Sequence, residues 1–221
     1  MIEPYVFFEN FKTFESKFSQ ELEVLNIGIL SKFFCNKNVM LEYYHQFIKP
    51  NKPKIVLCGI NPGKNGAGKT GIPFFDLHSL HDLLPTICAA PTDDKPESSA
   101  KFMYNIVKQF GMQYFFKNFY LTNISCIGFY DIKTNKNINY YELPVRIQIY
   151  IFDLFSTEIN TINPKIIIPL SVEVEKSLIM DLKHEKKIKA EIGKRLQHPA
   201  YKGAKICDYI ELLEQYIRIY K

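Results

Sequence analysis

The sequence predicts a three-layer α/β/α fold, in which helices cover both faces of a central, mainly parallel sheet of about four strands. Residues 54–60, 119–123 and 165–170 are continuous apolar runs, which is typical of strands buried on both faces. Helical patterns separate these runs, as expected when parallel strands are joined by crossover helices. A fourth, shorter strand is expected at residues 192–196.

The first fifty residues are expected to be a mostly helical N-terminal part of a single domain that spans residues 1–221. Residues 4–34 have helical spacing, with large apolar side chains recurring at intervals of three and four. We interpret this stripe, which is rich in phenylalanine, as core packing rather than a ligand site. Residues 40–48 are expected to form a short helix or an extended segment.

The rest of the chain alternates between expected helices and polar loops. Loops are expected at residues 90–99 and 125–139, where polar residues cluster. Ser98 or Ser99 could cap the helix that follows the first of these loops. The expected helices cover residues 78–84, 99–110, 142–162, 172–182 and 204–220.

Composition limits the classes of function. The formal charge of +5 and the pI near 8.8 fit an anionic partner without requiring one. The five cysteines form no C-x-x-C pair and have no histidine at zinc spacing, so we expect free thiols and no metal or cofactor. With no signal peptide and no membrane span, we expect an intracellular monomer, cytoplasmic in a bacterium or nuclear in a eukaryote.

Three polar side chains each follow a predicted strand. Asn61 follows the first strand, Asn123 ends the second, and His198 comes after the last. Ligands of open α/β sheets bind beyond the carboxyl ends of the strands, so these side chains should meet at one edge of the sheet.

The loop after the first strand fits two incompatible motifs. Residues 63–70 match the phosphate-binding pattern G-x-x-x-x-G-K-T, which would make the chain a nucleotide hydrolase. In that motif the Lys-Thr pair must open a helix, but here Gly71 and Pro73 disfavour helix continuation. A magnesium-binding aspartate is also missing from the ends of the other predicted strands. We therefore favour the second motif, which begins at Gly59.

This second motif resembles a known family. Gly59-Ile60-Asn61-Pro62-Gly63 and Thr70-Gly71-Ile72-Pro73-Phe74 are similar to the first motif of the single-strand-selective monofunctional uracil-DNA glycosylases, in the uracil-DNA glycosylase superfamily. Further segments resemble the same family in the same order, over roughly residues 54–205, and details of the loop are closer to a bacterial branch. These segments are Ser98–Phe102, Leu121–Asn123, Glu142–Pro144 and Leu196–Pro199.

The resemblance implies a monofunctional DNA glycosylase that removes uracil, and other deaminated or oxidised bases, in base excision repair. Asn61 would position the attacking water, and His198 would donate a hydrogen bond to the departing base. Ile60 and Gly63 would bind the base through backbone amides, while Phe74 would stack on it and Asn123 would bind its edge. Each side chain also has an ordinary structural explanation: an Asn-Pro turn, a strand cap, a lone histidine or core packing.

The expected partner is DNA that contains uracil or a related damaged base. Tyr201 could enter the gap left by an extruded base, while Lys202 and Lys205 hold phosphates, and Lys69 could also contact DNA. The basic run at residues 186–189 is interpreted as a solvated face. A DNA-binding module without catalysis is the alternative to a glycosylase on the same fold.

The chain departs from the family at two places. Ser125-Cys126-Ile127 stands where the family usually has a Cys-Pro pair, which affects the shape of the base pocket. Residues 200–203 stand where better-known members have a Ser-Pro-Arg wedge loop. The preference for single-stranded or double-stranded DNA therefore stays open.

Overall fold

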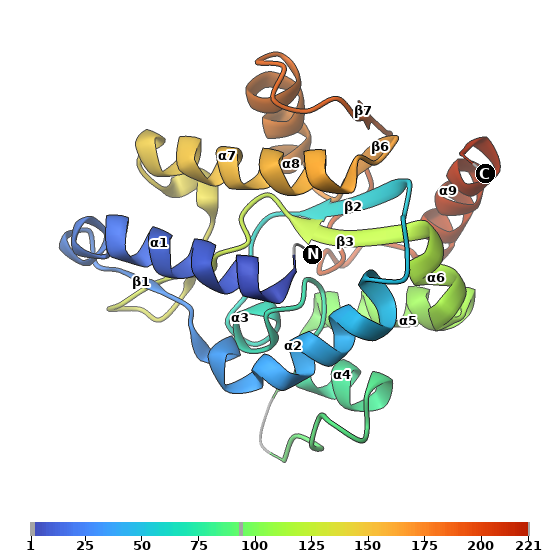
Figure 1. Cartoon of the computed structure of the whole chain (residues 1–221), viewed down its shortest axis with the longest axis horizontal. Helices are drawn as coiled ribbons and strands as arrows, with labels where there is room; N and C mark the ends of the chain where they lie inside the picture. The colour runs from blue at the N-terminus through green and yellow to red at the C-terminus, as the bar shows by residue number, and fades with distance from the viewer. Residues whose placement is uncertain (1–2, 93–94, 221) are drawn as a thin grey trace.

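The computed structural model describes residues 3–92 and 95–220. A four-stranded sheet lies at its centre (Figure 1), with β2 (Ile55–Gly59) and β6 (Ile166–Pro169) in the middle. The strands β3 (Phe119–Asn123) and β7 (Glu191–Ile192) form the edges, so the order is β3-β2-β6-β7. Every neighbouring pair is parallel, which confirms the predicted fold class.

Helices connect and cover these strands. The segment α3 is a single turn after β2, and η3 is a 3-10 turn that precedes α7. The elements outside the N-terminal part are α3 (Ala67–Thr70), α4 (Leu77–Leu83), α5 (Ser98–Phe110), α6 (Met112–Asn118), η3 (Tyr140–Glu142), α7 (Val145–Ile162), α8 (Val172–Lys176), η4 (Ser177–Lys183) and α9 (Ile206–Ile219).

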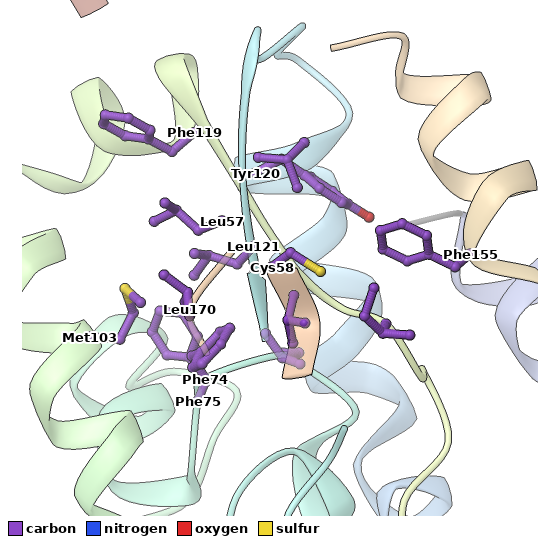
Figure 2. Packing of buried hydrophobic residues seen from close by; sticks show 14 of the residues in the cluster. Leu57, Cys58, Phe74, Phe75, Met103, Phe119, Tyr120, Leu121, Phe155 and Leu170 are labelled. Carbon is purple, nitrogen blue, oxygen red and sulfur yellow. The ribbon is translucent and has the colours of Figure 1, made fainter. Parts of the chain in front are cut away.

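Side chains along β3 alternate between the two faces of the sheet, as an extended strand requires. Leu121 lies on the same side as Met103 of α5 (Figure 2). Tyr120 lies on the opposite side, near Phe155 of α7. The sheet is thus packed on both faces, which explains why its strands are continuous apolar runs.

The N-terminal part differs from the expected long helix. The helix α1 (Pro4–Val24) ends ten residues early, where Asn26 adopts a φ of 58°. Residues that had been expected in the helix form β1 (Ile27–Ile29), because the chain must turn to pair with a later strand. The elements η1 (Lys32–Asn36), α2 (Lys37–Tyr43) and the π-helical η2 (Tyr44–Ile48) follow.

The expected loop at 125–139 contains a hairpin instead. Its strands β4 (Phe129–Asp131) and β5 (Asn137–Ile138) pair with each other, and β4 pairs with β1, all antiparallel. The sequence carries no strand pattern for this hairpin, because β5 is only two residues long, polar in part and not buried.

Other boundaries also moved. The helix at 172–182 is α-helical only to Lys176 and then continues as the π-helical η4. The last strand is shorter than the expected 192–196. Glu97, rather than a serine, precedes α5, and no side chain caps that helix. No helix in the described ranges is long and apolar enough to cross a bilayer.

Candidate active site

A pocket of about 150 Å³ lies at the carboxyl edge of the sheet. All the residues that were predicted to be catalytic or to bind the base line it, although they come from distant parts of the chain. The lining comprises Ile60, Asn61, Pro62, Gly63, Ala67, Phe74, Glu97, Ser99, Asn123, Asn137, Asn139 and His198. Strand register explains part of this assembly, because Gly59 and Asn123 are paired at the ends of β2 and β3.

The Asn61 side chain is fixed by the end of β5 and the start of η3. Its Nδ2 donates to the carbonyl of Ile138 at 3.3 Å, and its Oδ1 accepts from the backbone N–H of Tyr140 at 3.1 Å. A further contact of 3.4 Å joins Nδ2 to the carbonyl of Pro62. The Oδ1 atom retains a second lone pair, which could accept a hydrogen bond from a water molecule.

Asn123 and Phe74 meet above Gly59. A Cβ atom on Gly59 would lie 2.4 Å from Asn123 Oδ1 and 2.4 Å from Phe74 Cζ, so only glycine leaves room for both side chains. Phe74 is buried and has a φ of 62°, which is a rare conformation for a bulky residue. Strained backbone of this kind is concentrated at functional sites, where the surrounding structure holds it.

Thr70 holds the turn that carries Phe74. Its buried hydroxyl lies 2.8 Å from the carbonyl of Phe75 and 3.3 Å from that of Ile72, and it accepts from the Ile72 N–H. The preceding helix α3 ends at Thr70, and Gly71 follows with a φ of 71°. This hydroxyl is therefore committed to the backbone, whereas the phosphate-binding motif would require it to face a magnesium ion at a helix start.

His198 has a defined tautomer. Its Nδ1 accepts a hydrogen bond from the backbone N–H of Ala200 at 3.1 Å, so the neutral ring carries its proton on Nε2. Burial lowers the pKa of His198, and the negative charge of Glu173 opposes that effect. The side chain is therefore a neutral donor at the pocket.

Glu97 is a lining residue that sequence reasoning missed. Its pKa is raised, chiefly by burial, while a hydrogen bond with the Ser99 side chain opposes the shift and the charge of Asp76 adds to it. Asn137 of the unpredicted hairpin and Asn139, which follows it, were missed as well. Their sequence signal was weak, because these residues also fit an ordinary polar loop.

The residues predicted to contact DNA lie outside this pocket. Tyr201, Lys202 and Lys205 are exposed on the loop that follows His198. The ring of Tyr201 lies against Gly203, on which a Cβ would be 2.5 Å from Tyr201 Cε1. Lys69 is half-buried in α3, and its carbonyl accepts from Asn36 Nδ2 at 2.9 Å.

The turn after β3 has its own support. Ser125 is buried, and its hydroxyl donates to the carbonyl of Ile127 at 2.7 Å and accepts from the Ile127 N–H at 3.2 Å. This side chain closes the turn at the position where the similar family usually has Cys-Pro. Within residues 3–92 and 95–220, no three His, Cys, Asp or Glu side chains are grouped as metal ligands would be.

Comparison with known proteins identifies a similar fold and a family. The crystal structure of wild-type SMUG2 from Pedobacter heparinus is similar, with a TM-score of 0.67 and 26% sequence identity. The similarity covers 88% of this chain and 87% of that one. The sequence has no significant match among curated proteins. A family model of the uracil DNA glycosylase superfamily matches residues 45–211, which include every lining residue, and the chain belongs to this superfamily.

Proposed function

We propose that this chain hydrolyses the N-glycosidic bond of uracil in DNA, in base excision repair. The observation that carries the proposal is the convergence of Asn61, Phe74, Asn123 and His198 in one pocket at the carboxyl edge of the sheet. Asn61 supplies an acceptor for a hydrogen bond from water, and Phe74 supplies a stacking surface. Asn123 supplies an amide, and His198 supplies a neutral hydrogen-bond donor. Membership of the superfamily and the similarity to SMUG2 support a glycosylase in general terms.

The reaction separates charge within the pocket. As the bond to the base breaks, positive charge develops on the deoxyribose and negative charge on the base. Asn61 would hold a water at the sugar through its free lone pair, and its three backbone partners keep the amide oriented. Because an amide is a poor proton acceptor, Asn61 would position the water rather than deprotonate it.

The base would be held on three sides. Phe74 would stack on the ring, and the Asn123 amide would pair with an adjacent carbonyl and N–H of uracil. His198 would donate its Nε2 proton to the carbonyl on which negative charge develops. The hydrogen bond from Ala200 is consistent with this role, since it orients the ring with its proton on the other nitrogen.

The target base must leave the double helix or single strand to reach this pocket. We propose that the loop after His198 contacts DNA at the mouth of the pocket. Tyr201 is an exposed aromatic side chain that could enter the gap, and Lys202 and Lys205 are exposed cations that could bind phosphates.

The test uses oligonucleotides that contain one uracil, single-stranded and double-stranded, incubated with the protein in a chelator. We expect abasic sites to form. Removal of a preorganised hydrogen-bond donor costs about 10²–10³ in rate, so His198→Ala should lose that much activity. Asn61→Ala should be similarly impaired, and both variants should retain the circular dichroism spectrum of the wild type.

Two results would count against the proposal. Binding to DNA without release of any base, on uracil, xanthine or hypoxanthine substrates, would indicate a DNA-binding module. Magnesium-dependent hydrolysis of a nucleoside triphosphate that is abolished by Lys69→Ala would instead indicate the phosphate-binding motif.

A further inference from the structure

Glu97 fills one corner of the pocket, above the turn that joins Gly63 to Gly66. A Cβ atom placed on Gly66 would lie 1.5 Å from Glu97 Oε2, and one placed on Gly63 would lie 2.7 Å from Oε1. The carboxyl group therefore occupies the space that side chains at these two positions would otherwise take. The corner is closed by Glu97, which directly precedes α5, and not by a side chain of the glycine-rich loop.

The position of Glu97 is well supported. Its backbone N–H donates to Asp76 Oδ2 at 2.8 Å, and the buried Asp76 carboxylate also accepts from the Ser79 N–H at the start of α4. The Ser99 side chain forms a hydrogen bond with the Glu97 carboxyl. The start of α4 thus holds the backbone of Glu97, and Ser99 of α5 holds its side chain.

The Glu97 carboxyl group stands in this corner at an energetic cost. Burial is unfavourable for a charged carboxylate, and the nearby Asp76 carboxylate makes it more so. The hydrogen bond with the Ser99 side chain opposes this effect and keeps the carboxyl group in place. Residues that lower local stability are frequently retained because they have a function. We therefore ask which part of a ligand would contact Glu97.

The other sides of the pocket already have partners for a base. Under the proposed function, Phe74 covers the ring face, Asn123 binds one edge and His198 contacts a carbonyl. The C5 side of the uracil ring is then left for the corner that Glu97 closes. Among the residues that the structure describes, Glu97 is the only Asp, Glu, Lys or Arg in the lining of this pocket.

We propose that Glu97 is a specificity-determining residue that limits the size of the substituent on C5 of the base. This inference rests on the proposed function, because it takes the orientation of the base from the roles of Phe74, Asn123 and His198. A group added at C5 would have to displace the carboxyl group and break its hydrogen bond with Ser99.

The test compares one oligonucleotide sequence that carries uracil, thymine or 5-hydroxymethyluracil at the target position. These bases share the edge that Asn123 would bind and differ only at C5. The measured quantity is kcat/KM for each 5-substituted base divided by kcat/KM for uracil. One methylene group in a pocket changes such ratios by about 10–200-fold, so Glu97→Ala should raise them by at least about tenfold.

Glu97→Gln is the matched control, because it keeps the shape of the side chain and removes its charge. We expect this variant to keep the wild-type ratios. If the alanine variant does not fold, Glu97→Asp, which is one methylene shorter, should still raise the ratios. A folded Glu97→Ala protein with unchanged ratios would overturn the inference, as would an equal rise in Glu97→Gln.

Failure of the proposed function would look different. A wild-type protein that releases no base from any substrate would remove the proposed function and this inference with it. A wild-type protein that is active on uracil, with variants whose ratios do not change, would remove the inference alone. A uniform loss on all three bases in Glu97→Ala would indicate general support of the pocket and would also overturn it.

Discussion

Gly59 offers the sharpest test of the pocket geometry, because a single methyl group there would collide with two proposed base-binding side chains. The Cβ of Gly59→Ala would lie 2.4 Å from both Asn123 Oδ1 and Phe74 Cζ. Gly59 is the last residue of β2, and its φ is not in the left-handed region. The expected effect is therefore steric and does not arise from backbone strain.

The size of the effect follows from the displacement. Ordinary van der Waals contact with a Cβ begins at 3.4 Å, so Asn123 and Phe74 must each move by about 1 Å. A misplacement of this size costs about 10²-fold in rate. Overpacking of a buried site also lowers the free energy of unfolding by about 1–3 kcal/mol.

The assay measures kcat/KM for uracil release together with the thermal unfolding temperature. Gly193→Ala is the matched control, since its Cβ would lie 2.9 Å from Tyr216 Oη and 3.0 Å from Ile166 Cδ1, outside the pocket lining. We expect Gly59→Ala to lose activity and Gly193→Ala to retain it. Wild-type activity in a folded Gly59→Ala protein would refute the placement of Asn123 and Phe74 at the base.

The remaining predictions concern charge and the core. Because burial lowers the pKa of His198 from its ordinary 6.5, the folded chain binds this proton less readily than the unfolded chain. Acidification below pH 6.5 should therefore lower the free energy of unfolding, as measured by urea titration. The loss should be smaller in His198→Asn than in the wild type. An equal loss in the two proteins would contradict the lowered pKa of His198. Lys202→Ala should weaken DNA binding and reduce the slope of the logarithm of the binding constant against the logarithm of the salt concentration by about 0.7–0.9. The control, Lys189→Ala, should change neither quantity. Equal effects of the two substitutions would argue against the proposed loop contact. The buried Tyr120 hydroxyl donates to the Glu158 carboxylate at 2.5 Å, and Glu158→Ala would remove this acceptor. Calorimetry should therefore show a loss of about 1–3 kcal/mol in the free energy of unfolding. An unchanged unfolding temperature would contradict this prediction.

The fold was predictable where burial acts on both faces of an element. Residues 55–59, 119–123 and 166–169 form strands inside the expected runs, because parallel strands between helical layers must be apolar throughout. The short, partly exposed strands at 27–29 and 137–138 carry no such signal, since their pairing depends on contacts between distant parts of the chain. Local sequence cannot encode those contacts.

The pocket was predictable to the extent that it is built from strand ends. Asn61 follows β2 and Asn123 ends the neighbouring β3, so the parallel register brings them to one edge. Glu97 reaches the pocket differently, through the start of a helix that is held by Asp76. Such a contact depends on tertiary packing and leaves no periodic pattern in the sequence.

The G-x-x-x-x-G-K-T match shows how one set of residues can satisfy a motif and still serve a different structure. Glycines in a phosphate-binding loop let backbone N–H groups face an anion. Here Gly63 and Gly66 leave space for the Glu97 carboxyl, a negative group from within the protein itself. Thr70 likewise directs its hydroxyl to the turn that carries Phe74. The motif residues therefore shape a pocket wall, and a bound phosphate at Gly66 would have to displace a carboxylate.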